Sequence, residues 1–232
     1  MSKIKKVFSY FTKAEKIILF SSLALIILSF LIFDRENYLA FIASLLGAIS
    51  LIFNAKGNPV GQVLIIIFAF IYGYISFGFG YYGEMMTYVG MSAPMATFSL
   101  ISWLRNPYKG KRSEVTIATL KPFDVAIGAF LAIFVTVAFY FILAYFNTAN
   151  LIVSTLSVAT SFFAAYFLFR RSPYFALAYA VNDVVLIVLW VLASIEDISY
   201  ISVVICFATF LINDTYSFIN WKRMRKRQRI GL

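Results

Sequence analysis

The sequence predicts an all-α integral membrane protein, and two observations carry this fold class. Apolar residues make up 62% of the 232-residue chain and charged residues 13%, whereas a soluble domain has roughly 45–50% and about 25%. Long uncharged stretches also recur along the chain, each close to the roughly 20 residues that one helix needs to cross a bilayer. The composition excludes a water-soluble enzyme, because too little polar surface remains to cover so apolar a core.

The uncharged stretches predict eight transmembrane helices. Runs 17–33, 37–55 and 85–104 each match one crossing, and run 57–83 holds one crossing followed by a Gly/Tyr-rich exit. Run 125–169 is too long for a single helix, and the turn signal at 147–150 divides it. The predicted helices are 17–33, 38–54, 60–79, 85–103, 124–146, 151–169, 174–194 and 198–220.

The basic residues predict the orientation of these helices. With the N-terminus in the cytoplasm, nineteen of the 20 Lys and Arg residues fall in cytoplasmic segments, and only Arg35 lies in an outer loop. The positive-inside rule therefore predicts cytoplasmic N- and C-termini and an even number of helices. No A-x-A cleavage site follows the first span, so we interpret it as an uncleaved helix. The net charge of +10 is thus a topology signal and not an affinity for nucleic acid.

The two sides of the long basic loop resemble each other. Phe98–Trp103 and Tyr216–Trp221 share Ser, Ile and Trp at corresponding positions, and Asn58-Pro59 is weakly similar to Ser172-Pro173. Helices two to four and six to eight start and end on the same sides of the membrane. We therefore expect two parallel three-helix repeats about an axis along the membrane normal, with a ligand site between them near the midplane.

This interpretation divides the chain into six segments. The fifth predicted helix becomes a linker between the repeats, and the first helix becomes an extra. The segments are 1–37 (cytoplasmic N-terminus and first helix), 38–104 (first three-helix bundle), 105–123 (basic cytoplasmic loop), 124–146 (linker helix), 147–221 (second three-helix bundle) and 222–232 (basic cytoplasmic tail).

A few polar residues at membrane depth are the candidates for function. Asp183 lies near the middle of the seventh predicted helix, where an acidic residue costs about 2.5–3.5 kcal/mol to insert, and no basic residue lies at that depth. Asp214 either joins the same site or pairs with an Arg of the tail. Packing explains single residues such as Asn54 or Thr97 equally well. The candidate substrate-binding residues are Asp183, Asn182, Trp190, Asn213, Tyr216, Asn220, Gln62, Tyr72 and Tyr179.

These residue types point to a planar, cationic, hydroxylated ligand. Tyr and Trp faces attract a ring cation, a buried carboxylate supplies the opposite charge, and Asn and Gln bond hydroxyl and amide groups. The sequence has no His, no P-loop motif for ATP and no visible nucleophile–base set. We therefore expect no catalytic residue, no metal and no cofactor.

The chain resembles the PnuC family of bacterial vitamin-precursor transporters over about residues 38–222. The resemblance rests on Asn58-Pro59, the stretch 78–83, Asn182-Asp183 and an N-x-x-Y motif at Asn213–Tyr216. It implies a three-plus-one-plus-three core similar to that of the SWEET sugar carriers. It also implies facilitated uptake of nicotinamide riboside across the bacterial inner membrane, trapping by a cytoplasmic kinase that feeds NAD synthesis, and a homotrimer.

Two alternatives follow from the same residues. Many riboside carriers of this family have a W-x-x-W pair in the helix that bears Asn182-Asp183, whereas this chain has Tyr174, Phe175 and Tyr179 in that region. Thiamine, another cationic ring carried by close relatives, is therefore the second candidate substrate. An alternative from a different class is a membrane-embedded interaction subunit that binds no ligand.

Overall fold

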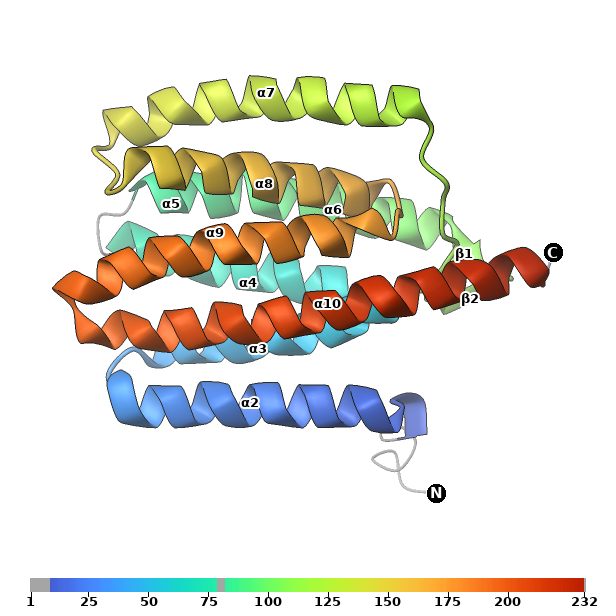
Figure 1. The fold of residues 1–232 in the computed structure, drawn as a ribbon, viewed down its shortest axis with the longest axis horizontal. Helices are drawn as coiled ribbons and strands as arrows, with labels where there is room; N and C mark the ends of the chain where they lie inside the picture. The colour runs from blue at the N-terminus through green and yellow to red at the C-terminus, as the bar shows by residue number, and fades with distance from the viewer. Residues whose placement is uncertain (1–8, 79–81, 232) are drawn as a thin grey trace.

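The computed structural model describes residues 9–78 and 82–231 as a helical bundle with a small hairpin at one end (Figure 1). Phe79, Gly80 and Tyr81 of the Gly/Tyr-rich exit, and Lys3, Lys5 and Lys6, lie outside the described residues. The helices are α2 (Lys13–Phe33), α3 (Tyr38–Ala55), α4 (Val60–Gly78), α5 (Tyr82–Thr87), α6 (Ala93–Arg105), α7 (Pro122–Tyr145), α8 (Leu151–Phe169), α9 (Tyr174–Glu196) and α10 (Ile201–Ile230). The shorter elements are the π-helical turn η1 (Tyr88–Ser92), the 3₁₀ turn η2 (Ile198–Tyr200) and the strands β1 (Pro107–Tyr108) and β2 (Lys111–Val115).

Helices occupy all eight predicted segments, and the all-helical architecture is confirmed. The fourth crossing is not one regular helix, because α5, η1 and α6 follow one another without a break in the chain. Pro94 has no N–H, and its ring excludes the carbonyl four residues back. The Ala93 N–H instead bonds the Tyr88 carbonyl, five residues back. Of the described residues, seven uninterrupted helices are therefore long and apolar enough to span a membrane.

The last helix continues well beyond its predicted end at residue 220. Residues expected to form a basic tail extend α10 to Ile230, because Lys, Arg, Met and Gln are good helix formers. Gln228 accepts a hydrogen bond from the Ile117 N–H (2.8 Å) and donates to the Val115 carbonyl (3.0 Å), while Arg227 pairs with Glu114. These contacts fix the end of α10 against the hairpin.

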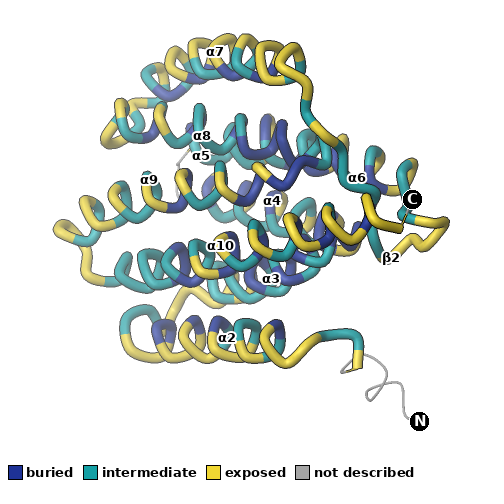
Figure 2. The backbone as a smooth tube through the Cα atoms, turned by 45° about the vertical axis from the view of Figure 1, so that its right-hand side comes forward, coloured by how far each residue is buried: buried dark blue, intermediate teal, exposed yellow. Residues whose placement is uncertain are grey.

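Six of the helices form a closed ring. Neighbours around the ring are α3, α4, α6, α8, α9 and α10, and α10 returns to contact α3. Outside the ring, α7 packs mainly on α8, whereas α2 packs on α3 and α10. Figure 2 shows the buried residues of α2 and α7 on the sides that face the bundle, with exposed residues elsewhere. Exposed apolar side chains on α7, including Phe130, Phe134 and Phe141, suit contact with lipid.

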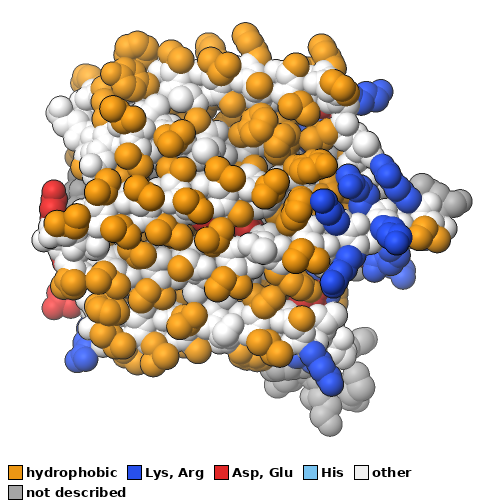
Figure 3. All heavy atoms as spheres, in the orientation of Figure 1, with side chains coloured by type: hydrophobic (Ala, Val, Ile, Leu, Met, Phe, Trp, Pro, Cys, Tyr) orange, Lys and Arg blue, Asp and Glu red, His pale blue; other side chains and the backbone are white. Residues whose placement is uncertain are grey.

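The two ends of the bundle differ in charge (Figure 3). Lys and Arg side chains gather at the end that carries the hairpin and the C-terminus, which we call the basic end. Asp34 follows the end of α2, and Glu196 and Asp197 close α9 at the opposite, acidic end. Lys13 and Ile230 mark helix ends at the basic end (Figure 1).

Two tryptophans cross-link the ring at its basic end. The Trp103 indole of α6 donates to the Leu168 carbonyl of α8 (3.1 Å), and the Trp221 indole of α10 donates to the Asn54 carbonyl of α3 (2.8 Å). Both rings are fully buried, and their centroids lie 5.5 Å apart. Each carbonyl belongs to the last turn of its helix and also accepts a backbone N–H from the following turn, Leu168 from Arg171 and Asn54 from Gly57 (both 2.9 Å). The two bonds therefore close the ring at matching positions.

The hairpin segment ties together the turns that follow α3 and α8. Gly57 and Arg171 both adopt left-handed backbone conformations, with φ of 64° and 56°. The Gly57 carbonyl accepts from the Val115 N–H (2.9 Å), and the Arg171 carbonyl accepts from the Ala118 N–H (3.0 Å). The basic loop is thus an ordered bridge between two equivalent turns.

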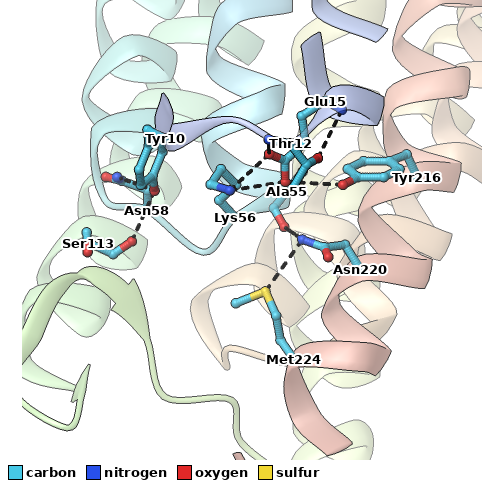
Figure 4. Close-up of polar contacts among 10 residues, drawn as sticks. All are labelled: Tyr10, Thr12, Glu15, Ala55, Lys56, Asn58, Ser113, Tyr216, Asn220 and Met224. Atoms are coloured by element: carbon cyan, nitrogen blue, oxygen red, sulfur yellow. Dashed lines mark hydrogen bonds and ion pairs between the residues drawn. The ribbon is translucent and has the colours of Figure 1, made fainter. Parts of the chain in front are cut away.

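A buried ion pair fixes α2 to the ring (Figure 4). Glu15 is 1% exposed and accepts from the Lys56 ammonium (2.9 and 3.1 Å) and from the Tyr216 hydroxyl (3.1 Å). The Lys56 ammonium also lies 4.6 Å from the ring centroid of Tyr10, whose hydroxyl accepts from the Asn58 amide (2.9 Å). Because a buried carboxylate needs such partners, this cluster defines where the first helix docks.

Replacing Glu15 with Gln should destabilise the protein, because it leaves the Lys56 ammonium without its opposite charge. We expect a loss of about 1–3 kcal/mol, and therefore a lower midpoint of thermal unfolding in detergent micelles. Glu36→Gln, on the exposed loop after α2, is the matched control. The double variant Glu15→Leu, Lys56→Met should recover part of the loss, since it removes both charges. Equal midpoints for Glu15→Gln and wild type would contradict this role.

Candidate functional site

The ring encloses a cavity of about 170 Å³ that receives side chains from all six of its helices. Its lining combines aromatic rings, amides, hydroxyls and two acids. The polar and aromatic lining residues are Asn54, Gln62, Phe68, Thr87, Tyr88, Ser92, Ser99, Ser157, Ser161, Phe175, Tyr179, Asn182, Asp183, Phe207, Phe210 and Asp214. We call this space the central cavity.

Two acids meet in the central cavity. Asp183 of α9 and Asp214 of α10 are 3% and 2% exposed, and their carboxyl groups lie within hydrogen-bonding range of each other. Oδ2 of Asp183 and Oδ1 of Asp214 have no hydrogen-bond partner in the described part of the chain. The described lining contains no Lys or Arg. Two buried carboxyl groups at this distance share a proton unless a cation compensates them. No described lining residue supplies that positive charge, which favours a cationic ligand.

An amide pair lies at the junction of α3 and α4. The Gln62 amide donates to the Asn54 side-chain oxygen (2.7 Å), and the two residues flank the short turn between the helices. Oε1 of the fully buried Gln62 and Oγ of Ser99 have no partner among the described residues. Most buried polar atoms in proteins are hydrogen-bonded, so these free groups indicate a polar ligand or water in the cavity.

One face of α9 contributes a continuous stripe to the central cavity. Phe175, Tyr179, Asn182 and Leu186 line it at the spacing of one helix face. The Asn182 oxygen accepts from the Thr160 hydroxyl of α8 (2.7 Å), which fixes the orientation of the amide. An aromatic ring, an amide and an acid are therefore presented within two turns.

The structure brings four of the predicted site residues together. Asp183, Asn182, Tyr179 and Gln62 all line the central cavity. Asp214, for which the sequence left two roles open, lies beside Asp183 and faces the cavity. Asn54 and Ser99 also line the cavity, although they are not among the candidate residues that the sequence predicts. The position of Asn54, eight residues before Gln62, could have indicated a shared site, whereas only its membrane depth distinguishes Ser99.

The other five predicted residues lie elsewhere. Tyr72 packs between Phe68 and Tyr88, with ring centroids 4.9 Å from each. Trp190 lines a second cavity, of about 380 Å³, toward the acidic end. In α10, Asn213 donates to the Ser22 hydroxyl (2.9 Å), Tyr216 to Glu15 and Asn220 to the Ala55 carbonyl (2.8 Å).

The stripe of Asn213, Tyr216 and Asn220 thus faces α2 and the end of α3. The cavity-facing position of this helix is Asp214, roughly 100° around the axis from Asn213. The helix spacing predicted which residues share a face, but the packing of α2 decided what that face contacts. Figure 4 shows Tyr216 and Asn220 directed toward Glu15 and Ala55.

The described residues contain no group of three or more Cys, Asp or Glu side chains placed to hold a metal ion. The central cavity offers a ligand carboxyl groups, aromatic rings and hydrogen-bonding groups. Its hydrogen-bond acceptors for hydroxyl and amide groups come from several helices of the ring.

Comparison with known proteins places this geometry in a family context. The family model described as nicotinamide mononucleotide transporter matches residues 37–223. A curated protein of Neisseria mucosa, nicotinamide riboside transporter PnuC, is 23% identical over 202 residues, covering 84% of this chain and 76% of that protein.

A solved structure gives the same picture of the fold. The crystal structure of the vitamin B3 transporter PnuC superposes with a TM-score of 0.79 at 22% identity, covering 94% of both chains. The family match spans α3 through most of α10, and so includes every helix of the ring. We conclude that this chain is a multi-pass membrane transporter that belongs to the nicotinamide mononucleotide transporter family.

Proposed function

We propose that this protein carries nicotinamide riboside across the membrane and binds it in the central cavity. The observation that carries the proposal is the meeting of Asp183 and Asp214 in a described lining without Lys or Arg. Nicotinamide riboside combines a permanent pyridinium charge with a flat ring, a carboxamide and a ribose. The Neisseria mucosa relative is a nicotinamide riboside transporter, which supports the same substrate.

Each part of this ligand has a counterpart in the cavity. The carboxyl pair supplies charge to the pyridinium, and the Tyr179 and Tyr88 rings provide aromatic faces that attract a ring cation. Gln62 and Asn182 supply amides for the carboxamide or the ribose hydroxyls. Trp190, Asn213, Tyr216, Asn220 and Tyr72 lie outside this cavity, and we assign the binding role to the residues that line it.

We further propose that the ring consists of two three-helix repeats, α3–α6 and α8–α10, joined by α7, with α2 as the extra helix. Three pairs of features support a two-fold relation. Trp103 and Trp221 make matching bonds, Gly57 and Arg171 occupy matching left-handed turns, and Asn58 and Ser172 donate to carbonyls five residues back (both 3.0 Å). A site on such an axis suits alternating exposure to the two sides.

The proposed topology places the basic end in the cytoplasm of a bacterial cell, so that both termini lie on the cytoplasmic side of the inner membrane. The gathering of Lys and Arg side chains at the basic end supports this topology. Transport is then facilitated diffusion, with a cytoplasmic kinase trapping the product for NAD synthesis. The family resemblance supports a homotrimer.

Two other functions share some of this evidence. Thiamine is also a cationic ring. Because α9 has no W-x-x-W pair and presents Phe175 and Tyr179 to the cavity, thiamine is the second substrate to test. A membrane interaction subunit without a ligand is the alternative from another class, and the free polar atoms in the cavity count against it.

A binding titration should separate the two vitamins. We expect nicotinamide riboside to raise the unfolding temperature of the purified protein in proportion to the logarithm of its concentration, and thiamine to have a smaller effect. Calorimetry on the same samples gives the dissociation constants. Tight thiamine binding with no riboside signal would reverse the assignment.

Uptake into vesicles should distinguish uniport from coupled transport. In proteoliposomes without a kinase, labelled riboside should equilibrate with the outside concentration and then stop, because nothing consumes it. A protonophore should leave the plateau unchanged. Accumulation above the outside level would exclude uniport and indicate a proton step at Asp183 or Asp214.

Asp183→Asn should separate a binding role from a structural one. The change keeps the shape but removes one negative charge, so we expect riboside affinity to fall by about tenfold or more, the equivalent of about 1.4 kcal/mol. Thermal stability without ligand should not fall, because the change relieves repulsion with Asp214. Glu36→Gln should change neither quantity. Unaltered riboside binding and uptake in Asp183→Asn would favour the interaction-subunit function.

A further inference from the structure

The second cavity, at the acidic end, is larger than the central cavity, at about 380 Å³. It lies where the start of α5, the turn between α7 and α8, the end of α9 and η2 come together. We call it the acidic-end cavity. Its described lining includes Tyr82, Glu84, Phe146, Trp190, Glu196 and Tyr200.

The lining combines two acids with aromatic rings. Glu84 and Glu196 carry its formal charge, and no Lys or Arg occurs among the described lining residues. The Trp190 and Tyr200 ring centroids lie 5.3 Å apart, and Tyr82 lies 5.4 Å from Phe146. Carboxylates beside indole and phenol faces are the chemistry that attracts a planar organic cation.

Neutral contacts hold one of these acids in place. The Glu84 carboxyl accepts a hydrogen bond from the Ser76 hydroxyl of α4, and Ser76 is buried. Such a bond orients the carboxyl group and favours its charged form, which burial opposes and a bound cation would stabilise. Glu196, at the end of α9, is exposed, so one acid of the cavity faces solvent while the other lies deeper.

The two cavities follow one another along the same helices. On α9, Asp183 and Leu186 line the central cavity, and Leu189 and Trp190 line the acidic-end cavity. Seven residues of helix place Trp190 about 10 Å along the axis from Asp183. On the fourth crossing, Glu84 lines the acidic-end cavity and Thr87 lines the central cavity, one turn later. Only about one turn of each helix separates the two spaces.

We propose that the acidic-end cavity is an entry subsite, which takes a planar organic cation before that cation reaches the central cavity. Trp190 provides the stacking face, and Glu84 and Glu196 supply the opposite charge. This inference rests on the proposed function, because an entry subsite requires a cationic cargo. It gives Trp190 a role in binding that is separate from the central site.

An entry subsite of this kind accelerates capture more than it strengthens final binding. Negative charge at a cavity mouth raises the local concentration of a cation and its association rate, and salt screens the effect when the charge is exposed. The final affinity depends on the central cavity. Uptake at low substrate concentration should therefore depend on the two glutamates and on ionic strength.

The first test uses Trp190 as a reporter and 1-methylnicotinamide, a pyridinium cation that quenches indole fluorescence on contact, as the probe. Full-length protein in lipid nanodiscs should show saturable quenching that Trp190→Phe abolishes. Glu84→Gln with Glu196→Gln should raise the half-saturating concentration about fivefold or more. Glu36→Gln, which removes an acid at the same end but outside the cavity, and Asp183→Asn should leave it unchanged.

Three results would overturn the entry subsite. They are quenching of the same strength in the double glutamine variant, equal quenching by uncharged nicotinamide, and loss of quenching in Asp183→Asn. The last would mean that the signal comes from the central cavity. Size-exclusion profiles and unfolding midpoints check that the variants are folded.

The second test measures riboside uptake into proteoliposomes below saturation. At low salt, the initial rate of the double glutamine variant should be about fivefold lower than that of the wild type. Between about 20 and 300 mM salt, the wild-type rate should fall and the rate of the variant should change much less. Its final plateau should equal that of the wild type. An initial rate equal to that of Glu36→Gln would overturn the proposal.

The two assays separate the entry subsite from the proposed function. If wild-type vesicles take up no riboside while 1-methylnicotinamide still quenches Trp190 through the glutamates, the proposed substrate is wrong and cation binding at the acidic-end cavity stands. If riboside uptake is intact and independent of both glutamates, the entry subsite alone is wrong.

Discussion

The hydrogen bonds of the two indoles at the basic end, which join the two halves of the ring, are the interactions on which the rest of the bundle depends. A buried indole N–H needs an acceptor within the protein, and Trp103 and Trp221 each find one in the last turn of a helix from the opposite half of the ring. Each bond joins a helix of one half of the chain to a helix of the other. Asn54 connects the closed ring to the central cavity, because its carbonyl accepts from the Trp221 indole and its side-chain oxygen accepts from the Gln62 amide.

Polar groups within the membrane fall into two populations. Many hydroxyls bond a carbonyl one turn back on their own helix, as Thr97 does with Ala93 and Thr136 with Ala132, so they need nothing further. Around the central cavity, by contrast, Gln62 and Ser99 retain unpaired atoms. Both populations contain the same kinds of side chain, so residue type alone does not separate packing from binding.

Much of the helical layout was predictable because charge is costly in hydrocarbon. The same cost made Asp183 and Asn182 predictable, since a polar residue at that depth needs a reason. The contacts of Asn213 and Tyr216 were not predictable, because the spacing of residues on α10 is silent about which helix covers that face. The end of α10 was missed for a related reason: its charged residues look like a solvated tail until the hairpin is there to meet them. Pro94 prevents a regular hydrogen bond to the carbonyl four residues back, but that alone does not specify the π-helical turn that the chain forms there.

The hydrogen bonds that join Gly57 and Arg171 to the hairpin segment affect how much the sequence can change while the fold is kept. Both bonds join main-chain atoms, which are present whichever side chains stand at those positions. The remaining demand is a left-handed conformation at two residues, and position 171 meets it with Arg at a cost of roughly 1–2 kcal/mol. A connection with so few requirements tolerates extensive substitution. Helix ends joined in this way can keep their spacing in homologues whose identity to this chain has fallen below a quarter.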